Sequence, residues 1–146
     1  MRKQGIEAIG IDFERNPQKP AAPIINCDLS TPTGQAKVLE LDLEMQFDVL
    51  HGAPPCGTAS RARERPLPAA LVRQGVPTPR QLRSNQFPEG LPSLTENEQM
   101  RVTLANKIYT FVLQICIDRH KNNRFFSLEN PDASYFMRAY GKGAAM

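Results

Sequence analysis

The sequence lacks the features that mark several common protein classes. It contains no tryptophan, and aromatic residues make up 7% of its 146 residues, which argues against a large aromatic binding surface. Its three cysteines are odd in number and widely spaced, so we expect neither a disulfide framework nor a metal site. The longest apolar stretch, residues 108–117, is too short to cross a bilayer, and no secretory signal precedes it. We therefore expect a soluble intracellular protein without a membrane partner.

Positive charge is modest overall but unevenly distributed. The formal net charge is +3, whereas the segment from Arg61 to Arg83 contains six arginines and a single acid, Glu64. Prolines concentrate in the same part of the chain, with eight of the thirteen in residues 54–94. A basic segment on a nearly neutral chain favours an anionic partner bound at one face. We expect residues 54–94 to form a long, mostly irregular loop with a functional role.

Short apolar runs alternate with helical patterns along the chain. Four runs lead into polar or reactive residues: 8–11 before Asp12, 24–27 before Asp28, 47–51 before the segment ending at Cys56, and 124–128 before Glu129. This alternation predicts an α/β fold with a mostly parallel four-stranded sheet and flanking helices. Because ligands of such sheets bind beyond the carboxyl ends of the strands, these polar residues are the first candidates for a site.

Helices are expected between and after these strands. Residues 33–45 carry apolar residues for packing, and residues 96–120 repeat apolar residues at helical spacing. Thr95 and Glu98 form a capping-box pattern at the start of the longer helix. A further helix is expected over residues 131–140.

Cys56 is the residue with the clearest chemical potential. Two prolines fix the backbone before it, and Gly57 after it allows a substrate to approach closely. The arginines that follow would favour the nucleophilic thiolate. The alternative is a buried structural cysteine, which is our expectation for Cys27 and Cys116. A phosphatase loop is excluded, because it requires a His directly before the Cys and a longer spacing to the Arg than Cys56 to Arg61 provides.

The segment Gly52-Ala53-Pro54-Pro55-Cys56-Gly57-Thr58-Ala59-Ser60 resembles the Pro-Cys motif of the DNA cytosine-5 methyltransferases, which also follows a strand. Leu128-Glu129-Asn130 resembles the Glu-Asn motif of that family, reached here through a helix as in the family. Asp12, Phe13 and Asp28 lie where the family binds the ribose and the adenine of its methyl donor. The resemblance covers residues 5 to 136, and the order and spacing of these elements carry it.

The resemblance implies cytosine-5 methylation of DNA, with RNA less favoured, and S-adenosylmethionine as the methyl donor. Cys56 would attack C6 of a flipped-out cytosine, and Glu129 would hydrogen-bond N3 of the base. The donor would be bound by Asp12, Phe13, Asp28 and Pro54. The nucleic acid would be bound by Ser60, Arg61, Arg63 and Arg65. Such a protein is expected in the nucleus of a eukaryote and in the cytoplasm otherwise.

The sequence departs from the family pattern in several places. Gly57 stands where the family usually has Gln, and Pro131 stands where Val is common. A Gly-rich donor loop should precede Gly5, and a target-recognition region should follow residue 140. We therefore expect an interior fragment of weak or no activity alone, with a second chain as one source of the missing elements. Its partial domain would span residues 1–140, with residues 54–94 as an inserted loop and residues 141–146 as a flexible tail.

The missing first strand sets an expectation for the sheet. That strand would lie between the run ending at Asp12 and the run ending at His51. We expect these two runs to pair directly, with backbone hydrogen bonds between residues 8–12 and 47–51. The strand order would then be second run, first run, third run, fourth run.

Each candidate residue also has a purely structural interpretation. Asp12 and Asp28 could cap turns, Glu129 could be a surface residue, and the arginines could form a solvated loop. The alternative function is a non-catalytic nucleic-acid-binding or interaction fragment that uses the basic, Pro-rich loop.

Overall fold

The structure is a computed structural model that describes residues 5–13, 20–131 and 134–135. The chain divides into two compact units, residues 1–48 and 49–146, which are described separately. Most of the helix expected over residues 131–140, and the tail expected at 141–146, lie outside the described residues.

The N-terminal unit contains two short strands and one helix. Strands β1 (Gly10–Asp12) and β2 (Ile24–Asn26) are parallel, with Asp12 opposite Asn26. Helix α1 (Pro32–Met45) begins where the Thr31 side chain accepts a hydrogen bond from the Gly34 N–H, and Pro32 suits a first helical position because its missing N–H needs no partner. A Cβ at Gly34 would lie 2.1 Å from the Asp28 carbonyl oxygen, so only glycine fits there.

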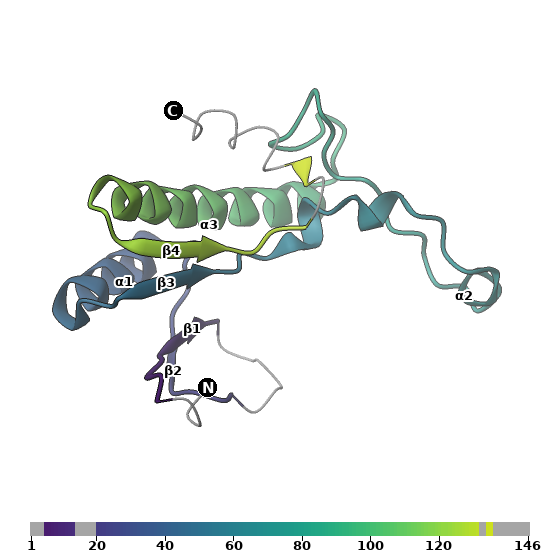
Figure 1. The fold of residues 1–146 in the computed structure, drawn as a ribbon. Helices are drawn as coiled ribbons and strands as arrows, with labels where there is room; N and C mark the ends of the chain where they lie inside the picture. Colours follow the sequence, from purple (N-terminus) through teal and green to yellow (C-terminus); the bar gives the residue numbers. More distant parts are fainter. Residues whose placement is uncertain (1–4, 14–19, 132–133, 136–146) are drawn as a thin grey trace. The chain divides into compact units, whose positions relative to one another are not determined.

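The main elements in the described part of the C-terminal unit are a two-stranded sheet and a long helix. Strands β3 (Val49–Gly52) and β4 (Phe125–Leu128) are parallel, and helix α3 (Glu96–Lys121) packs along them (Figure 1). The buried residues of this unit centre on α3 and include Val102, Ala105, Tyr109 and Val112. The close packing of α3 against β3 requires a glycine at position 52, because a Cβ there would lie 2.8 Å from the Val112 side chain.

The ends of α3 agree with the sequence prediction. The Thr95 side chain caps the helix, and the Glu98 carboxylate accepts a hydrogen bond from the Thr95 N–H, which completes the predicted capping box. Basic residues occupy the last turn, where they interact favourably with the helix dipole. No helix in the described part of the chain is both long enough and apolar enough to cross a membrane.

Residues 54–94 are mostly irregular and hold only three short helices. They are η2 (Cys56–Thr58), η3 (Arg61–Glu64) and α2 (Ala69–Arg73). In Figure 1 this teal segment extends away from α3 and returns to it, with α2 at its far end. The expected long, irregular loop is therefore present.

The predicted four-stranded, truncated Rossmann-like sheet is wrong. All four strands form, and the pairs β1–β2 and β3–β4 are parallel as expected, but they belong to two separate two-stranded sheets. The expected bonds between residues 8–12 and 47–51 are not part of either ladder. Strand β1 covers only Gly10–Asp12, and so short a strand offers few ladder bonds to offset the entropy of closing a long loop. Apolar runs predict strands but not the choice of partner.

Candidate functional site

The two segments that carry the predicted chemistry leave neighbouring strands. Gly52 at the end of β3 lies opposite Leu128 at the end of β4. The Glu129 N–H then donates to the Gly52 carbonyl oxygen at 2.8 Å, which extends the pairing by one step. The Pro-Pro-Cys segment and the Glu-Asn segment therefore start side by side at the carboxyl ends of a parallel pair (Figure 1).

Cys56 is exposed and opens the short helix η2. Its carbonyl oxygen accepts hydrogen bonds from the Ala59 and Ser60 N–H groups at 3.0 and 2.9 Å, which curls the chain tightly behind it. A Cβ at Gly57 would meet nothing within 4 Å, so this glycine leaves open space beside the thiol. The thiol is accessible, as a nucleophile must be.

A buried tyrosine holds the residue before Cys56. The Tyr109 hydroxyl, on α3, donates to the Pro55 carbonyl oxygen at 2.7 Å. Tyr109 is fully buried, and burial raises the pKa of its hydroxyl from 10.0 to about 12. The hydroxyl therefore remains a protonated donor throughout the physiological range of pH.

Arg83 holds Thr58, two residues after the cysteine. Its guanidinium is fully buried and donates to the Thr58 carbonyl oxygen at 3.2 Å and to the Thr58 hydroxyl at 2.9 Å. It also donates to the Pro88 carbonyl oxygen and to Asn106 Oδ1, both at 2.7 Å. The guanidinium carbon lies 5.9 Å from the centre of the Tyr109 ring, within cation–π range.

Glu129 is in a contrasting environment. Its side chain is 75% exposed, and its carboxylate lies 3.9 Å from Nε2 of His51, whose Nδ1 is 2.8 Å from the Ser127 hydroxyl oxygen. This cluster lies on the surface. The following Asn130 differs, because both polar atoms of its side chain are buried and have no hydrogen-bond partner in the described part of the chain.

The predicted nucleic-acid-binding residues make contacts within the protein. Ser60 caps η3 by accepting from the Ala62 N–H. Arg61 pairs with Glu64 at 3.3 Å, and this carboxylate is the main cause of a raised pKa at Arg61. Arg63 donates to the carbonyl oxygens of Gly57 and Arg80 at 3.2 and 2.8 Å.

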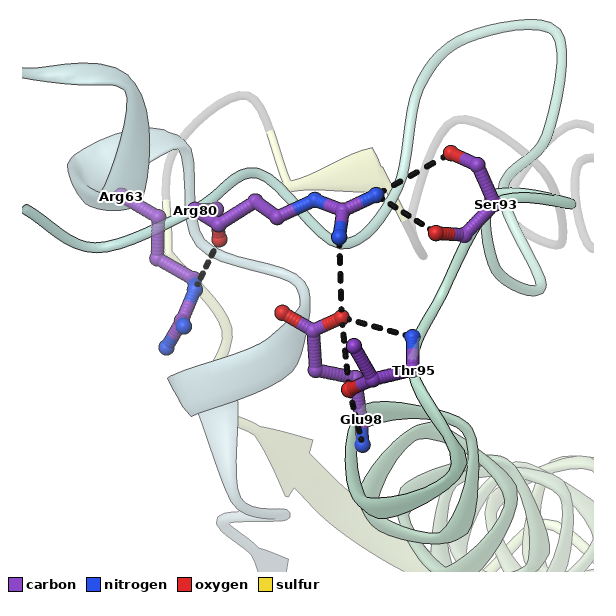
Figure 2. A network of polar contacts seen from close by, with 5 residues as sticks. All are labelled: Arg63, Arg80, Ser93, Thr95 and Glu98. Carbon is purple, nitrogen blue, oxygen red and sulfur yellow. Dashed lines mark hydrogen bonds and ion pairs between the residues drawn. The ribbon is translucent and has the colours of Figure 1, made fainter.

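A second network joins this segment to the start of α3. Figure 2 shows Arg63 donating to the backbone of Arg80, whose guanidinium reaches Glu98 at 3.3 Å and the Ser93 carbonyl oxygen at 2.6 Å. The Thr95 backbone N–H, which donates to Glu98, lowers the pKa of that carboxyl more than any other group does. The capping glutamate thus also anchors the basic segment.

Tyr135 connects the segment after β4 to the segment after Cys56. Its N–H donates to the Ala59 carbonyl oxygen at 3.3 Å, and its hydroxyl donates to Glu64 and accepts from Gln81. Burial, followed by the Glu64 carboxylate, raises the pKa of the Tyr135 hydroxyl. The guanidinium of Arg61 lies 5.6 Å from the centre of the ring.

The predicted donor-binding residues other than Pro54 lie in the N-terminal unit. Asp12 Oδ1 accepts from the Phe13 N–H at 2.8 Å, and the Phe13 ring is 63% exposed. Asp28 Oδ1 accepts from both the N–H and the hydroxyl of Ser30, at 2.9 and 2.7 Å. Asp28 thus forms the turn that leads into α1, as its structural interpretation anticipated.

Sequence reasoning missed two central residues. Arg83 counts among the six arginines of the basic segment and is not a predicted site residue, although it is buried, and the helical pattern alone does not single out Tyr109. Tyr109 lies one helical turn after Ala105 and one before Val112 on the buried face of α3, so its burial was predictable. Nothing in the sequence marks Arg83, because its burial depends on contacts with residues distant in the chain.

Among the described residues, no group of three or more His, Cys, Asp or Glu side chains could hold a metal ion. Comparisons with protein-family models, with curated proteins and with solved structures found no match to this chain.

Proposed function

We propose that the C-terminal unit carries the base-reacting part of a cytosine-5 methyltransferase-like site, with Cys56 as the nucleophile and Glu129 as the acid. The observation that carries the proposal is the parallel pairing of β3 and β4. This pairing sets the Pro-Pro-Cys segment beside the Glu-Asn segment. The adjacency supports the proposal, because two side chains that act on one base must come from neighbouring segments.

The chemistry divides between the two side chains. The Cys56 thiolate would add to C6 of cytosine, and the electron pair of the C5–C6 bond would become available at C5. A protonated Glu129 would hydrogen-bond N3 and stabilise the charge that develops there. C5 would then take the methyl group from the sulfonium of S-adenosylmethionine, which would leave as S-adenosylhomocysteine. Transfer of the C5 proton to water would restore the C5–C6 double bond and expel the thiolate.

The donor and the nucleic acid complete the proposal. S-adenosylmethionine would supply the methyl group. Within the N-terminal unit taken by itself, Asp12 and the exposed ring of Phe13 are the candidate residues for its ribose and adenine. Asp28 is a further candidate, and like Asp12 it already accepts a hydrogen bond at Oδ1. DNA is the proposed partner, bound through phosphate contacts at the exposed basic segment.

The alternative is a nucleic-acid-binding protein without catalysis. The observation that favours it is the exposure of Arg65 and Arg73, which make no ion pair with other described residues. Binding of this kind should weaken steeply with salt. Replacing Arg65 and Arg73 together should weaken it more than replacing Arg61, whose charge is already paired with Glu64.

Covalent trapping separates the two functions. DNA containing 5-fluorocytosine should form a stable adduct with the full chain in the presence of S-adenosylmethionine, because the fluorine leaves no C5 proton to remove. The adduct is detected by mass spectrometry of the intact protein. Cys56→Ala should abolish it.

The matched control is Cys27→Ala, which removes a half-buried thiol that donates to the Gly34 carbonyl oxygen. This variant should retain the adduct. Salt-dependent DNA binding without any adduct would favour the non-catalytic function, and an adduct that survives Cys56→Ala would exclude Cys56 as the nucleophile.

A further inference from the structure

Cys56 is an exposed residue between two positions that are held from the interior. Tyr109 binds the carbonyl group of Pro55, directly before it, and Arg83 binds both the carbonyl and the hydroxyl group of Thr58, two residues after it. Both donors are fully buried, whereas the thiol between the anchored positions is open to solvent. The contacts therefore fix the backbone around the cysteine without covering it.

The two donors support each other. The guanidinium of Arg83 lies against the Tyr109 ring, and Asn106, on the same helix as Tyr109, accepts from Arg83 at 2.7 Å. Asn106 in turn donates to the Glu89 carbonyl oxygen at 2.9 Å, so the chain around Arg83 is also tied to α3. Arginine suits this position because its planar fork presents several donors in fixed directions.

We propose that Tyr109 and Arg83 are positioning residues for Cys56, which hold Pro55 and Thr58 so that the thiol is presented at a fixed place beyond β3 for attack on the target base. The assignment rests on the proposed function, because it gives the fixed geometry a purpose. Neither residue touches the base. Their effect is on the rate of attack, since a nucleophile displaced by about 1 Å can lose about a hundredfold in rate.

Three variants of the full chain test the proposal. Tyr109→Phe keeps the ring and removes only the donor to Pro55. Thr58→Val keeps the shape and removes one acceptor of Arg83. Ile115→Val is the matched control, because it shortens a buried side chain on the same helix and leaves both anchors intact.

The first measurement is the rate of adduct formation on 5-fluorocytosine DNA, in the presence of S-adenosylmethionine, as a function of DNA concentration. Tyr109→Phe and Thr58→Val should lower the maximal rate by about tenfold or more, and the half-saturating DNA concentration should stay within about twofold. If the lower rate came from a loss of folded protein, Ile115→Val would show the same decrease in maximal rate. An unchanged maximal rate in both anchor variants would overturn the proposal.

The second measurement does not depend on the reaction. The N–H groups of Ala59 and Ser60 bond the Cys56 carbonyl oxygen, so their hydrogen exchange reports the order of the loop. Exchange at these two amides should be about tenfold faster in Tyr109→Phe than in wild type, with no change in Ile115→Val. Failure of the wild type to form an adduct would overturn the proposed function, whereas unchanged exchange in Tyr109→Phe would overturn the anchoring itself.

Discussion

The segments that follow β3 and β4 start at adjacent backbone positions but are held in opposite ways. The segment after β3 is anchored by buried donors, Tyr109 and Arg83, on both sides of Cys56. The segment after β4 begins with an exposed carboxylate, Glu129, which lies 3.9 Å from the ring nitrogen Nε2 of the exposed His51. Buried hydrogen bonds therefore fix the backbone on both sides of the thiol, whereas the Glu129 carboxylate lies at the surface.

The largest expected effect distinguishes a buried arginine from an exposed one. Arg83→Ala should lower the free energy of unfolding by about 3–5 kcal/mol, because it leaves several buried acceptors unsatisfied and opens a cavity. Arg80→Ala should cost about 1 kcal/mol or less, since its ion pair with Glu98 is partly exposed. Urea denaturation measures both. Equal decreases in the free energy of unfolding for the two variants would show that the burial of Arg83 does not make it more stabilising than Arg80.

A smaller effect concerns the pH dependence of the Tyr109 anchor. Its folded pKa of about 12 exceeds the ordinary value of 10.0, so its contribution is complete below pH 10 and is lost as the pH rises towards 12. Over that range wild type should lose about 2 kcal/mol more of its free energy of unfolding than Tyr109→Phe does. Urea denaturation at a series of pH values gives the difference, in which the other tyrosines cancel. If the free energy of unfolding fell equally with pH in the two proteins, the Tyr109 hydroxyl would not have a raised pKa.

The smallest expected effect is at the second segment. Glu129→Gln should change the free energy of unfolding by no more than about 0.5 kcal/mol, because the side chain is exposed and its contact with His51 is long. In the trapping reaction the same variant should lower the rate of adduct formation. A stability loss as large as that of Arg83→Ala would remove the contrast between the two segments.

The sequence predicted local structure and two of the three strand pairs, but not the division into two sheets. The capping box at Thr95 and the strand before Cys56 follow from side-chain chemistry and periodicity within a few residues. The pairing of β3 with β4 was also anticipated, because a helix connects them. The pairing of the Asp12 run with the His51 run was not made, since the apolar pattern of a strand is compatible with many partners.

The candidate site was predictable to a similar extent. The exposure of Cys56 follows from its place between prolines and a glycine, and the turn at Asp28 follows from the chemistry of Asp and Ser side chains. The roles of the arginines were not predictable from composition. Arg83 is buried, and Arg63 and Arg80 bind groups that are distant in the sequence, whereas Arg61 pairs with its local neighbour Glu64.

The burial of Arg83 also affects how the protein can move. A charged guanidinium that leaves the interior must be rehydrated, and it must release Thr58, Pro88 and Asn106 together. Opening of the loop that carries Cys56 should therefore require the release of this guanidinium, unlike the movement of a lid on a hinge. The thiol should be presented as soon as the contacts of Arg83 have formed.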